Sequence, residues 1–185
     1  MPTKLLAISG SVRKNSTNTA LLRRVSTLAP PEFDITVCDH VGQIPIFSPD
    51  LEGALTPDAV ETFAAKIGHA DGLLFACPEY AHGIPGGLKN ALDWLVSRFE
   101  VPDKPVMILH ASERGAHAKA ALAEVLRTMS MNIVEEASLT LHLIGKTPDE
   151  IDAIIALPQN SADIVARLHM FAAAIAGFQR QQAFA

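Results

Sequence analysis

Aromatic residues are scarce in this 185-residue chain: they make up 5% of it, with a single tryptophan and a single tyrosine. Aliphatic side chains must therefore fill the core, because apolar residues still account for 49% of the sequence. Charged residues are also few, at 19%, and the formal net charge of −5 gives no reason to expect nucleic acid as a partner. This composition supports a packed core and excludes a disordered chain.

Cysteines, metal-binding patterns and targeting signals are equally sparse. Cys38 and Cys77 do not form a metal-type pair and are expected to be reduced, buried residues. The seven histidines are dispersed, so we expect no metal site. We find no signal-like start and no unbroken apolar run of about 18 residues; the apolar segment 164–178 is interrupted by Arg167 and His169. We therefore expect a cytoplasmic protein without a membrane partner.

What is present is an alternation of short apolar runs with longer helical patterns. The runs read as strands at residues 4–9, 34–39, 72–77, 105–110 and 132–141. The helical patterns span residues 18–28, 56–70, 85–98, 116–129, a short segment from 147, and 161–178. Strands separated by helices indicate a parallel sheet covered on both faces, and we expect one domain over residues 1–185.

The loop after the first predicted strand is rich in hydroxyl side chains. It contains Ser11, Ser16 and Thr17 and leads into a helix, whose N-terminus attracts anions through free N–H groups and the helix dipole. Arg13 adds a charge that suits a phosphate. The loop has neither the P-loop nor the Gly-x-Gly-x-x-Gly fingerprint. Capping of the helix by Ser16, Thr17 or Asn18 is the alternative interpretation, so this loop alone leaves phosphate binding open.

A second loop, residues 78–90, follows the third predicted strand and contains two prolines and three glycines. In an open parallel sheet, ligands bind outside the carboxyl ends of the strands, where the strand order reverses. If the first and third strands are neighbours, this loop lies beside the first one, and its rigid backbone could pack against a flat ring. The alternative is a stiff turn before a helix, with Tyr80 and His82 on the surface.

Both loops match the signatures of a known family. Residues 9–18 resemble the Gly-Ser-x-Arg-x-x-Ser-x-Asn signature of the NADPH-dependent FMN reductase family, and residues 78–94 resemble its Pro-Glu-Tyr…Pro-Gly-x-Leu-Lys-Asn-x-x-Asp-Trp signature. The resemblance covers residues 4–141. It implies an α/β, flavodoxin-like three-layer sandwich with a five-stranded parallel sheet of order 2-1-3-4-5. It also implies FMN as the cofactor, with NADPH or NADH as electron donor.

The resemblance assigns residues to that cofactor. The phosphate would be held by Ser11, Arg13, Ser16, Thr17 and Asn18. The ribityl chain and the ring would be bordered by Pro78, Glu79, Tyr80, Ala81, His82 and Gly83. The loop 111–119, with Ser112, would close the far side. This chain has Ala81 where the family often has Asn, so the side-chain contact is lost there while the backbone N–H contacts remain. It also lacks the family's Gly-Gly in 112–117, where a close approach of the backbone to the ring is therefore not carried over.

The resemblance further implies a function. The family reduces small acceptors such as free flavin, quinones, chromate or azo compounds, and a ping-pong transfer of hydride through FMN is expected here. No protein acid, base or nucleophile stands out, which suits chemistry carried out by the flavin. The alternative is a non-enzymatic flavodoxin-type electron carrier, although such carriers are usually more acidic. No second nucleotide pocket is indicated, so we expect FMN to bind more tightly than FAD.

Subunit contacts are the last expectation. Members of the family are commonly dimers or tetramers, and one predicted helix has an apolar face of Leu88, Leu92 and Leu95. Both points favour a homodimer or homotetramer. The nearby Lys89, Asp93 and Trp94 are interpreted as structural or subunit-contact residues rather than as part of the site.

Overall fold

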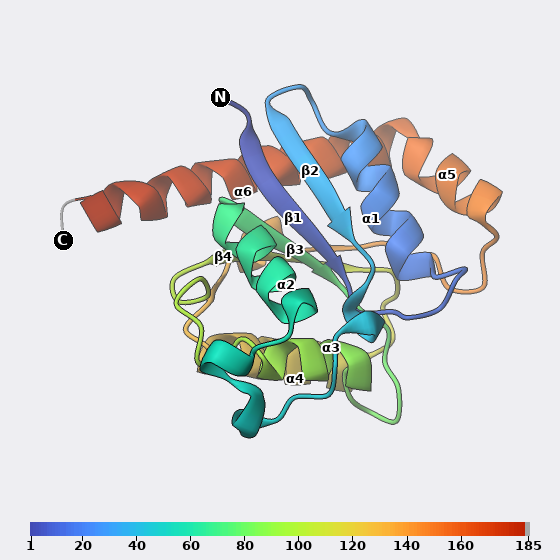
Figure 1. Ribbon diagram of the computed structural model, residues 1–185. Coiled ribbons are helices and arrows are strands. Elements are labelled where there is room, and N and C mark those ends of the chain that lie inside the picture. The colour runs from blue at the N-terminus through green and yellow to red at the C-terminus, as the bar shows by residue number, and fades with distance from the viewer. Residues whose placement is uncertain (184–185) are drawn as a thin grey trace.

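The computed structural model describes residues 1–183 and is built around one parallel sheet (Figure 1). Its strands are β1 (Thr3–Ser9), β2 (Phe33–Cys38), β3 (Gly72–Ala76), β4 (Pro105–His110), β5 (Asn132–Ile133) and β6 (Leu139–Thr140). They are hydrogen-bonded in the order β2-β1-β3-β4-β5, with β6 also paired to β4, and these pairings are all parallel. The predicted flavodoxin-like strand order is confirmed.

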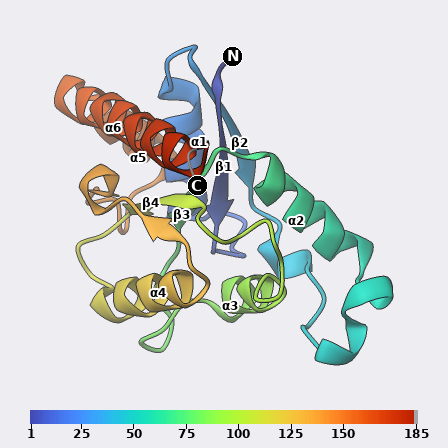
Figure 2. The ribbon, with the colours of Figure 1, turned by 90° about the vertical axis from the view of Figure 1, so that its left-hand side faces the viewer.

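Helices cover both faces of the sheet. They are α1 (Thr17–Leu28), α2 (Asp58–His69), α3 (Gly86–Asp93), α4 (Ala116–Thr128), α5 (Pro148–Ala156) and α6 (Pro158–Ala183). Short 3₁₀ turns lie at η1 (Val41–Gln43), η2 (Pro49–Leu51), η3 (Gly53–Leu55) and η4 (Glu135–Ala137). Figure 2 shows α1, α5 and α6 on one side of the strands and α2, α3 and α4 on the other. The result is the three-layer arrangement expected from the sequence.

The core lies in two halves separated by the sheet. Leu6 and Ile8 of β1 join the apolar cluster formed with α2, α3 and α4, whereas Leu5 and Ala7 join the cluster formed with α1, α5 and α6. Alternate residues of a strand point to opposite faces, so a central strand with helices on both sides must be apolar throughout. This is why β3 and β4 are continuous apolar runs in the sequence, whereas the edge strand β2 alternates buried and more exposed residues.

The longest helix, α6, is apolar for its length. Over Pro158–Arg180 its length and composition would allow it to cross a membrane, and 22% of its most apolar stretch is buried in the protein. That criterion carries little weight, because core helices of soluble proteins also meet it. Leu168, Phe171 and Ile175 of α6 belong to the core against the sheet. A Cβ on Gly72 of β3 would lie 2.9 Å from the Phe171 ring, so helix and sheet are in close contact there.

Three predicted elements were wrong in extent. The helix predicted at 161–178 is α6, which begins three residues earlier and ends five residues later. The strand predicted at 132–141 is two short strands interrupted by η4, which begins at Glu135. At the interruption the side-chain oxygen of Ser138 accepts the Ile108 amide at 3.2 Å, and Arg167 binds the Ser138 carbonyl at 2.5 Å. Side chains thus take over ladder bonds that the backbone was expected to make.

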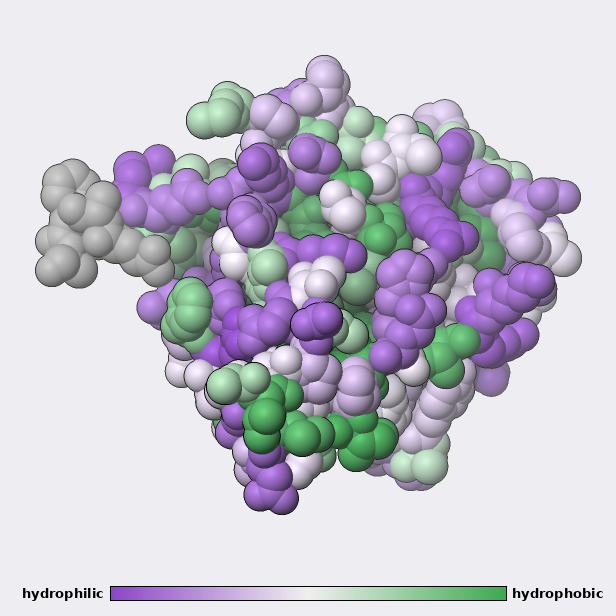
Figure 3. Space-filling model, viewed as in Figure 1, coloured by the Kyte–Doolittle hydropathy of each residue, from purple (hydrophilic) through white to green (hydrophobic). Residues whose placement is uncertain are grey.

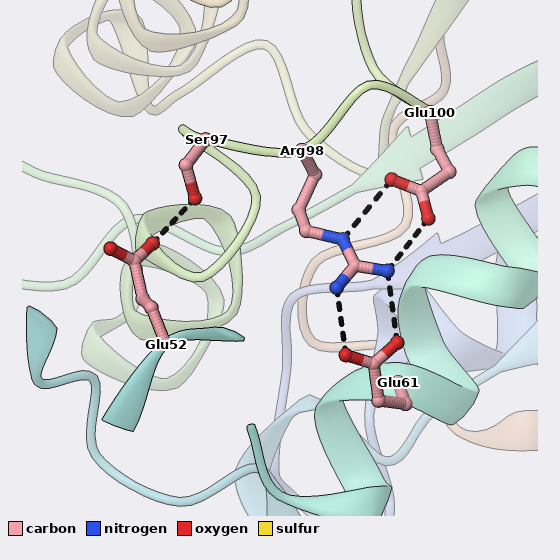
Figure 4. Close-up of polar contacts among 5 residues, drawn as sticks. All are labelled: Glu52, Glu61, Ser97, Arg98 and Glu100. Atoms are coloured by element: carbon pink, nitrogen blue, oxygen red, sulfur yellow. Dashed lines mark hydrogen bonds and ion pairs between the residues drawn. The ribbon is translucent and has the colours of Figure 1, made fainter. Parts of the chain in front are cut away.

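The helix predicted at 85–98 ends instead at Asp93. Beyond it, the Arg98 guanidinium binds both oxygens of Glu61 on α2, at 2.8 and 2.9 Å, and also Glu100, at 2.7 and 3.1 Å (Figure 4). These bonds hold the pKa values of Glu61 and Glu100 below their usual range. Arg98 gains two carboxylate partners in this position, and these ion pairs favour ending the helix before it.

Candidate functional site

The first loop leaves β1 in close contact with the neighbouring strand. The Gly10 amide donates to the Ala76 carbonyl at 2.8 Å, which extends the pairing of β1 and β3 by one residue. A Cβ on Gly10 would lie 2.6 Å from the Cβ of Cys77 and 2.7 Å from Leu88 Cδ2. Only glycine allows this approach, which brings the first loop beside the start of the second.

The buried polar side chains of the described residues all gather at this loop: Ser9, Ser11, Ser16, Asn18 and Thr19. Ser9 and Thr19 share a hydroxyl–hydroxyl hydrogen bond of 2.7 Å, and Ser16 Oγ accepts the Thr19 amide at 3.2 Å. The capping interpretation is therefore correct for Ser16. It does not account for the whole loop.

Capping leaves several donors free at the start of α1. Within the described part of the chain, the amides of Ser16, Thr17 and Asn18 donate to no acceptor. Arg13 lies beside them with its side chain exposed, and no carboxylate of the described residues lies within 4.0 Å of it. Free amides and an unpaired guanidinium at a helix N-terminus form an anion site.

The second loop is a tight turn. Tyr80 and Gly83 exchange two backbone hydrogen bonds of 3.0 Å each, and the residues between them, Ala81 and His82, have φ angles of 49° and 58°. Two central residues with positive φ are the mark of a type I′ turn, in which asparagine and glycine are preferred. The departure from the family pattern at Ala81 thus lies where the backbone conformation itself favours asparagine.

Glu79 joins the second loop to a third loop, residues 111–119. Its carboxylate accepts the Ala118 amide at 2.8 Å, in the first turn of α4. Gly115, at the N-terminus of α4, has φ 97° and so uses the left-handed conformation that glycine allows. Ser112 Oγ accepts the Arg114 amide at 2.9 Å and shapes the turn before it. Gly115 alone therefore provides the left-handed backbone conformation that this loop requires.

A cavity of about 400 Å³ opens between the three loops. Of the twelve predicted site residues, nine line it: Ser11, Arg13, Ser16, Thr17, Asn18, Pro78, Glu79, Tyr80 and Ser112. Ala81, His82 and Gly83 do not line it. They form the outer turn of the second loop, where the His82 ring stacks on His117 at 4.3 Å between ring centres.

Other lining residues were not singled out as site residues: Cys77, His110, Ala111, Arg114, Gly115, Ala118, Lys119, Ile144 and Gly145. Six of these lie within or next to the predicted third loop. Ile144 and Gly145 come from the connection between β6 and α5, and no motif in the sequence pointed to them. Ile144 is half exposed and presents an apolar surface to the cavity.

The cavity is electropositive and poor in reactive groups. Arg114 and Lys119 line it, and neither forms an ion pair among the described residues. Burial, and then Lys119, lower the pKa of His110 to about 4, so its imidazole is neutral at pH 7. Burial raises the pKa of Cys77 to about 12, so it stays a thiol rather than a nucleophilic thiolate.

These features fit FMN. The phosphate needs a concentrated anion site, which the free amides and Arg13 supply at one end of the cavity. A flat ring needs walls of backbone and apolar side chain, and Pro78, Tyr80 and Ile144 supply such surface elsewhere in the lining. Nothing among the described residues suggests a metal, since they contain no cluster of three histidine, cysteine or acidic residues.

The second signature also has a structural role. Asn90 of α3 accepts the Phe47 amide at 2.8 Å and donates to the Pro45 carbonyl at 2.9 Å. The buried Trp94 indole donates to the same carbonyl at 2.7 Å and packs edge-on against Phe47. Lys89 pairs with Asp93 on the surface of α3. These residues fix the loop 44–47 and lie outside the cavity, as the structural interpretation of Lys89, Asp93 and Trp94 predicted.

Comparison with known proteins finds several flavin-dependent reductases that this chain resembles. The chain is 36% identical over 167 residues to an NAD(P)H-dependent FMN reductase of Pseudomonas aeruginosa, covering 89% of this chain and 84% of that one. It is 33% identical over 143 residues to a quinone reductase of Escherichia coli, covering 76% and 66%. The fold matches FerB, an NAD(P)H:(acceptor) oxidoreductase from Paracoccus denitrificans, with a TM-score of 0.73 at 24% identity over 91% and 97% of the two chains.

The family itself is identified by a match over most of the chain. Residues 3–145 match the family model described as NADPH-dependent FMN reductase. The matched segment contains all three loops that surround the cavity. The family uses FMN and takes electrons from NAD(P)H, which does not favour the flavodoxin-type carrier. The chain therefore belongs to the NADPH-dependent FMN reductase family of oxidoreductases.

Proposed function

We propose that the cavity holds FMN with its phosphate at Ser11, Arg13, Ser16, Thr17 and Asn18 and its ring between the second and third loops. The carrying observation is that the buried polar side chains of Ser11, Ser16 and Asn18, the free amides at the start of α1 and Arg13, which has no ion-pair partner among the described residues, line a single cavity. The chain would then pass electrons from NAD(P)H to small acceptors such as quinones or free flavin.

The residues that line the cavity would bind and orient FMN rather than react themselves. FMN, when bound, supplies the redox chemistry by taking up hydride and passing electrons on. Arg13 and the α1 amides would anchor the phosphate, while Arg114 and Lys119 would keep the cavity positive and favour added negative charge. The neutral His110 and the protonated Cys77 add no competing base or nucleophile. Gly115 and Pro78 would keep the backbone close to the ring.

We expect the remaining predicted contacts to be peripheral. Ala81, His82 and Gly83 would border the ring only through the outer turn, because Glu79 and Tyr80 line the cavity and these three residues do not. Ser112 would meet the ligand from the far side. These assignments are testable residue by residue through FMN affinity.

The proposal includes a homo-oligomer, for a different reason from the one given by the sequence. Leu88, Leu92 and Leu95 are fully buried inside the subunit and cannot form a subunit contact. Large apolar side chains remain exposed instead on the loop 46–55 and just beyond α3, and we call them the apolar patch: Ile46, Leu51, Leu55, Val96 and Phe99. Figure 3 shows apolar side chains gathered at the bottom of the view, over the loop that contains η2 and η3. Large exposed apolar patches mark interaction surfaces.

We propose that this patch joins two copies of the chain, as a homodimer or within a homotetramer, in the cytoplasm. Light scattering should give a mass at least twice that of the chain, and Phe99→Asp should shift it toward the monomer. A single-chain mass at all concentrations would reject the oligomer.

The function itself is tested with purified, FMN-reconstituted protein, NADPH or NADH, and a quinone such as menadione. Catalytic oxidation of the nucleotide, with parallel lines in double-reciprocal plots, is the expected result. Bound FMN without turnover would identify an electron carrier. Protein that binds no FMN would reject the site as well as the activity.

A further inference from the structure

A second cavity, of about 620 Å³, lies between α1, the loop 13–16 and the start of α5, and we call it the basic groove. Figure 1 shows α1 and α5 side by side at this end of the molecule. The groove shares Arg13, Ser16, Thr17 and Gly145 with the first cavity, so the two meet at the phosphate loop. Its volume lies within the range of about 300–1,000 Å³ typical of small-molecule sites.

The basic groove concentrates positive charge on a protein whose net charge is −5. Five cationic side chains line it, against the single acid Asp152: Arg13, Lys14, Arg23, Arg24 and Lys146. Figure 3 shows strongly hydrophilic side chains over this side of the molecule. Local charge of this sign raises the concentration of anions at a surface.

Nearby acids neutralise the groove only in part. Arg23 is held by Asp39 at 2.5 Å, but Lys146 lies 3.7 Å from Glu150, which is beyond hydrogen-bond distance. Arg24 Nε lies 3.9 Å from Asp152, and no hydrogen bond satisfies that nitrogen within the described residues. Lys14 has no ion-pair partner there. Positive charges still outnumber negative ones when Asp39 and Glu150 are included.

The walls of the groove are not purely charged. Ala20 of α1 and Pro148 and Ile151 of α5 contribute apolar surface among the cations. Gly145, at the junction with the first cavity, has no side chain, and a Cβ built there would meet nothing within 4 Å. A ligand with a flat apolar part and more than one phosphate charge matches this combination better than an inorganic ion does.

We propose that the basic groove binds the adenosine-phosphate part of a dinucleotide. The inference rests on the proposed function, because it takes the flavin phosphate to lie at Ser16 and Thr17. Two dinucleotides carry this chemistry. In FAD, the AMP half would continue from the flavin phosphate into the groove, contrary to the sequence-based expectation of a single nucleotide pocket. In NADPH, the phosphorylated adenosine half would lie there while FMN fills the first cavity.

The test uses FMN-saturated protein and adenosine 2′,5′-bisphosphate as the probe, titrated by calorimetry. We expect saturable binding with one site per chain. The double variant Lys14→Gln/Lys146→Gln should weaken the probe by about tenfold or more, the loss expected for a charge-assisted hydrogen bond. Both lysines are exposed, so the fold should survive. Lys66→Gln, which removes the same charge from α2, is the matched control and should change nothing.

Two further arms distinguish the sources. If the groove serves FAD, the apoprotein binds FAD more tightly than FMN, and FAD-loaded protein no longer binds the probe. If it serves NADPH, the probe inhibits competitively against NADPH, and the double variant raises the KM for NADPH but not for NADH.

Several outcomes would overturn the proposal. No binding of the probe to FMN-loaded protein would do so, as would binding that the double variant leaves unchanged. Pyrophosphate binding as tightly as the probe would show an anion surface rather than a nucleotide site. Failure to load FMN at all would instead reject the proposed function, so the two failures are distinguishable.

Discussion

The first and second loops border the same cavity but are built in opposite ways. The first is anchored at both ends by buried, hydrogen-bonded side chains, those of Ser9, Ser16 and Thr19, although residues 12–15 are exposed, and no residue in it has a positive φ. The second is exposed at its tip, where Ala81 and His82 both adopt the left-handed conformation. The loop proposed to hold the phosphate is therefore preformed at low conformational cost, whereas the turn at the tip of the second loop stores strain. We therefore expect the proposed phosphate loop to keep FMN bound while smaller substrates exchange beside the second loop.

The strongest test of the anchor is Arg13→Ala. Loss of one charge-assisted hydrogen bond, at about 1.5–3 kcal/mol, should weaken FMN about tenfold to hundredfold. Riboflavin lacks the phosphate, so its affinity should hardly change, and calorimetry with both ligands measures the difference. Arg180→Ala, at the end of α6, is the control. An equal loss for both ligands would mean that Arg13 shapes the loop instead of binding phosphate.

Gly10→Ala attacks the close approach that fixes the first loop. The new Cβ would lie 2.6 Å from Cys77 and 2.7 Å from Leu88, so the loop must shift or the core must open. We expect a loss of about 1–3 kcal/mol in the free energy of unfolding, seen as a melting temperature lower by several degrees. Gly86→Ala has nothing within 4 Å of the new Cβ and should be nearly neutral. Equal melting temperatures for the two variants would contradict the packing argument.

His110, which also lines the cavity, makes the stability of the protein depend on pH. Its folded-state pKa of about 4 lies below the ordinary value of 6.5, because burial disfavours the charged ring. As the pH falls, His110 therefore becomes protonated near pH 6.5 in the unfolded chain but only near pH 4 in the folded chain. Stability should fall as the pH drops through this window, by up to about 1.4 kcal/mol per pH unit. Urea unfolding of His110→Gln between pH 7 and 4.5 should show a shallower decline; parallel curves would remove His110 as the cause.

Ala81→Asn tests the strain of the second loop and has the smallest expected effect. Asparagine tolerates the left-handed conformation better than alanine, so the variant should gain about 0.5–1 kcal/mol of stability. Ala54→Asn, in an exposed 3₁₀ turn without a positive φ, should show no such gain. A destabilised Ala81→Asn protein would show that the turn is not under this strain.

The sequence predicted the strands and the two signature loops well, because apolar runs and glycine-rich turns are local signals. β4 has the predicted bounds, and β1, β2 and β3 agree within one residue. The prediction at 132–141 was wrong because Ser138 and Arg167 replace backbone bonds there, and contacts so distant in sequence leave no periodic pattern.

The candidate site was predictable in part for the same reason. Nine of the proposed residues lie on one cavity because the carboxyl ends of β1 and β3 are adjacent. Ile144 and Gly145 were missed because they reach the cavity from a connection without a motif. The Leu88, Leu92 and Leu95 face was assigned to a subunit contact, although an apolar helix stripe points first to the subunit's own core.

The length of α6 has a practical consequence. Its 26 residues span about 39 Å, whereas the seven residues of β1 span about 23 Å, so the helix outruns the sheet it covers. Figure 1 shows its C-terminal end projecting at the left, while the strands point their carboxyl ends to the lower right. A linker to an electrode or a bead, attached at the exposed position 180, would leave the cavity facing the solution. Immobilised enzyme should therefore keep access to both nucleotide and acceptor.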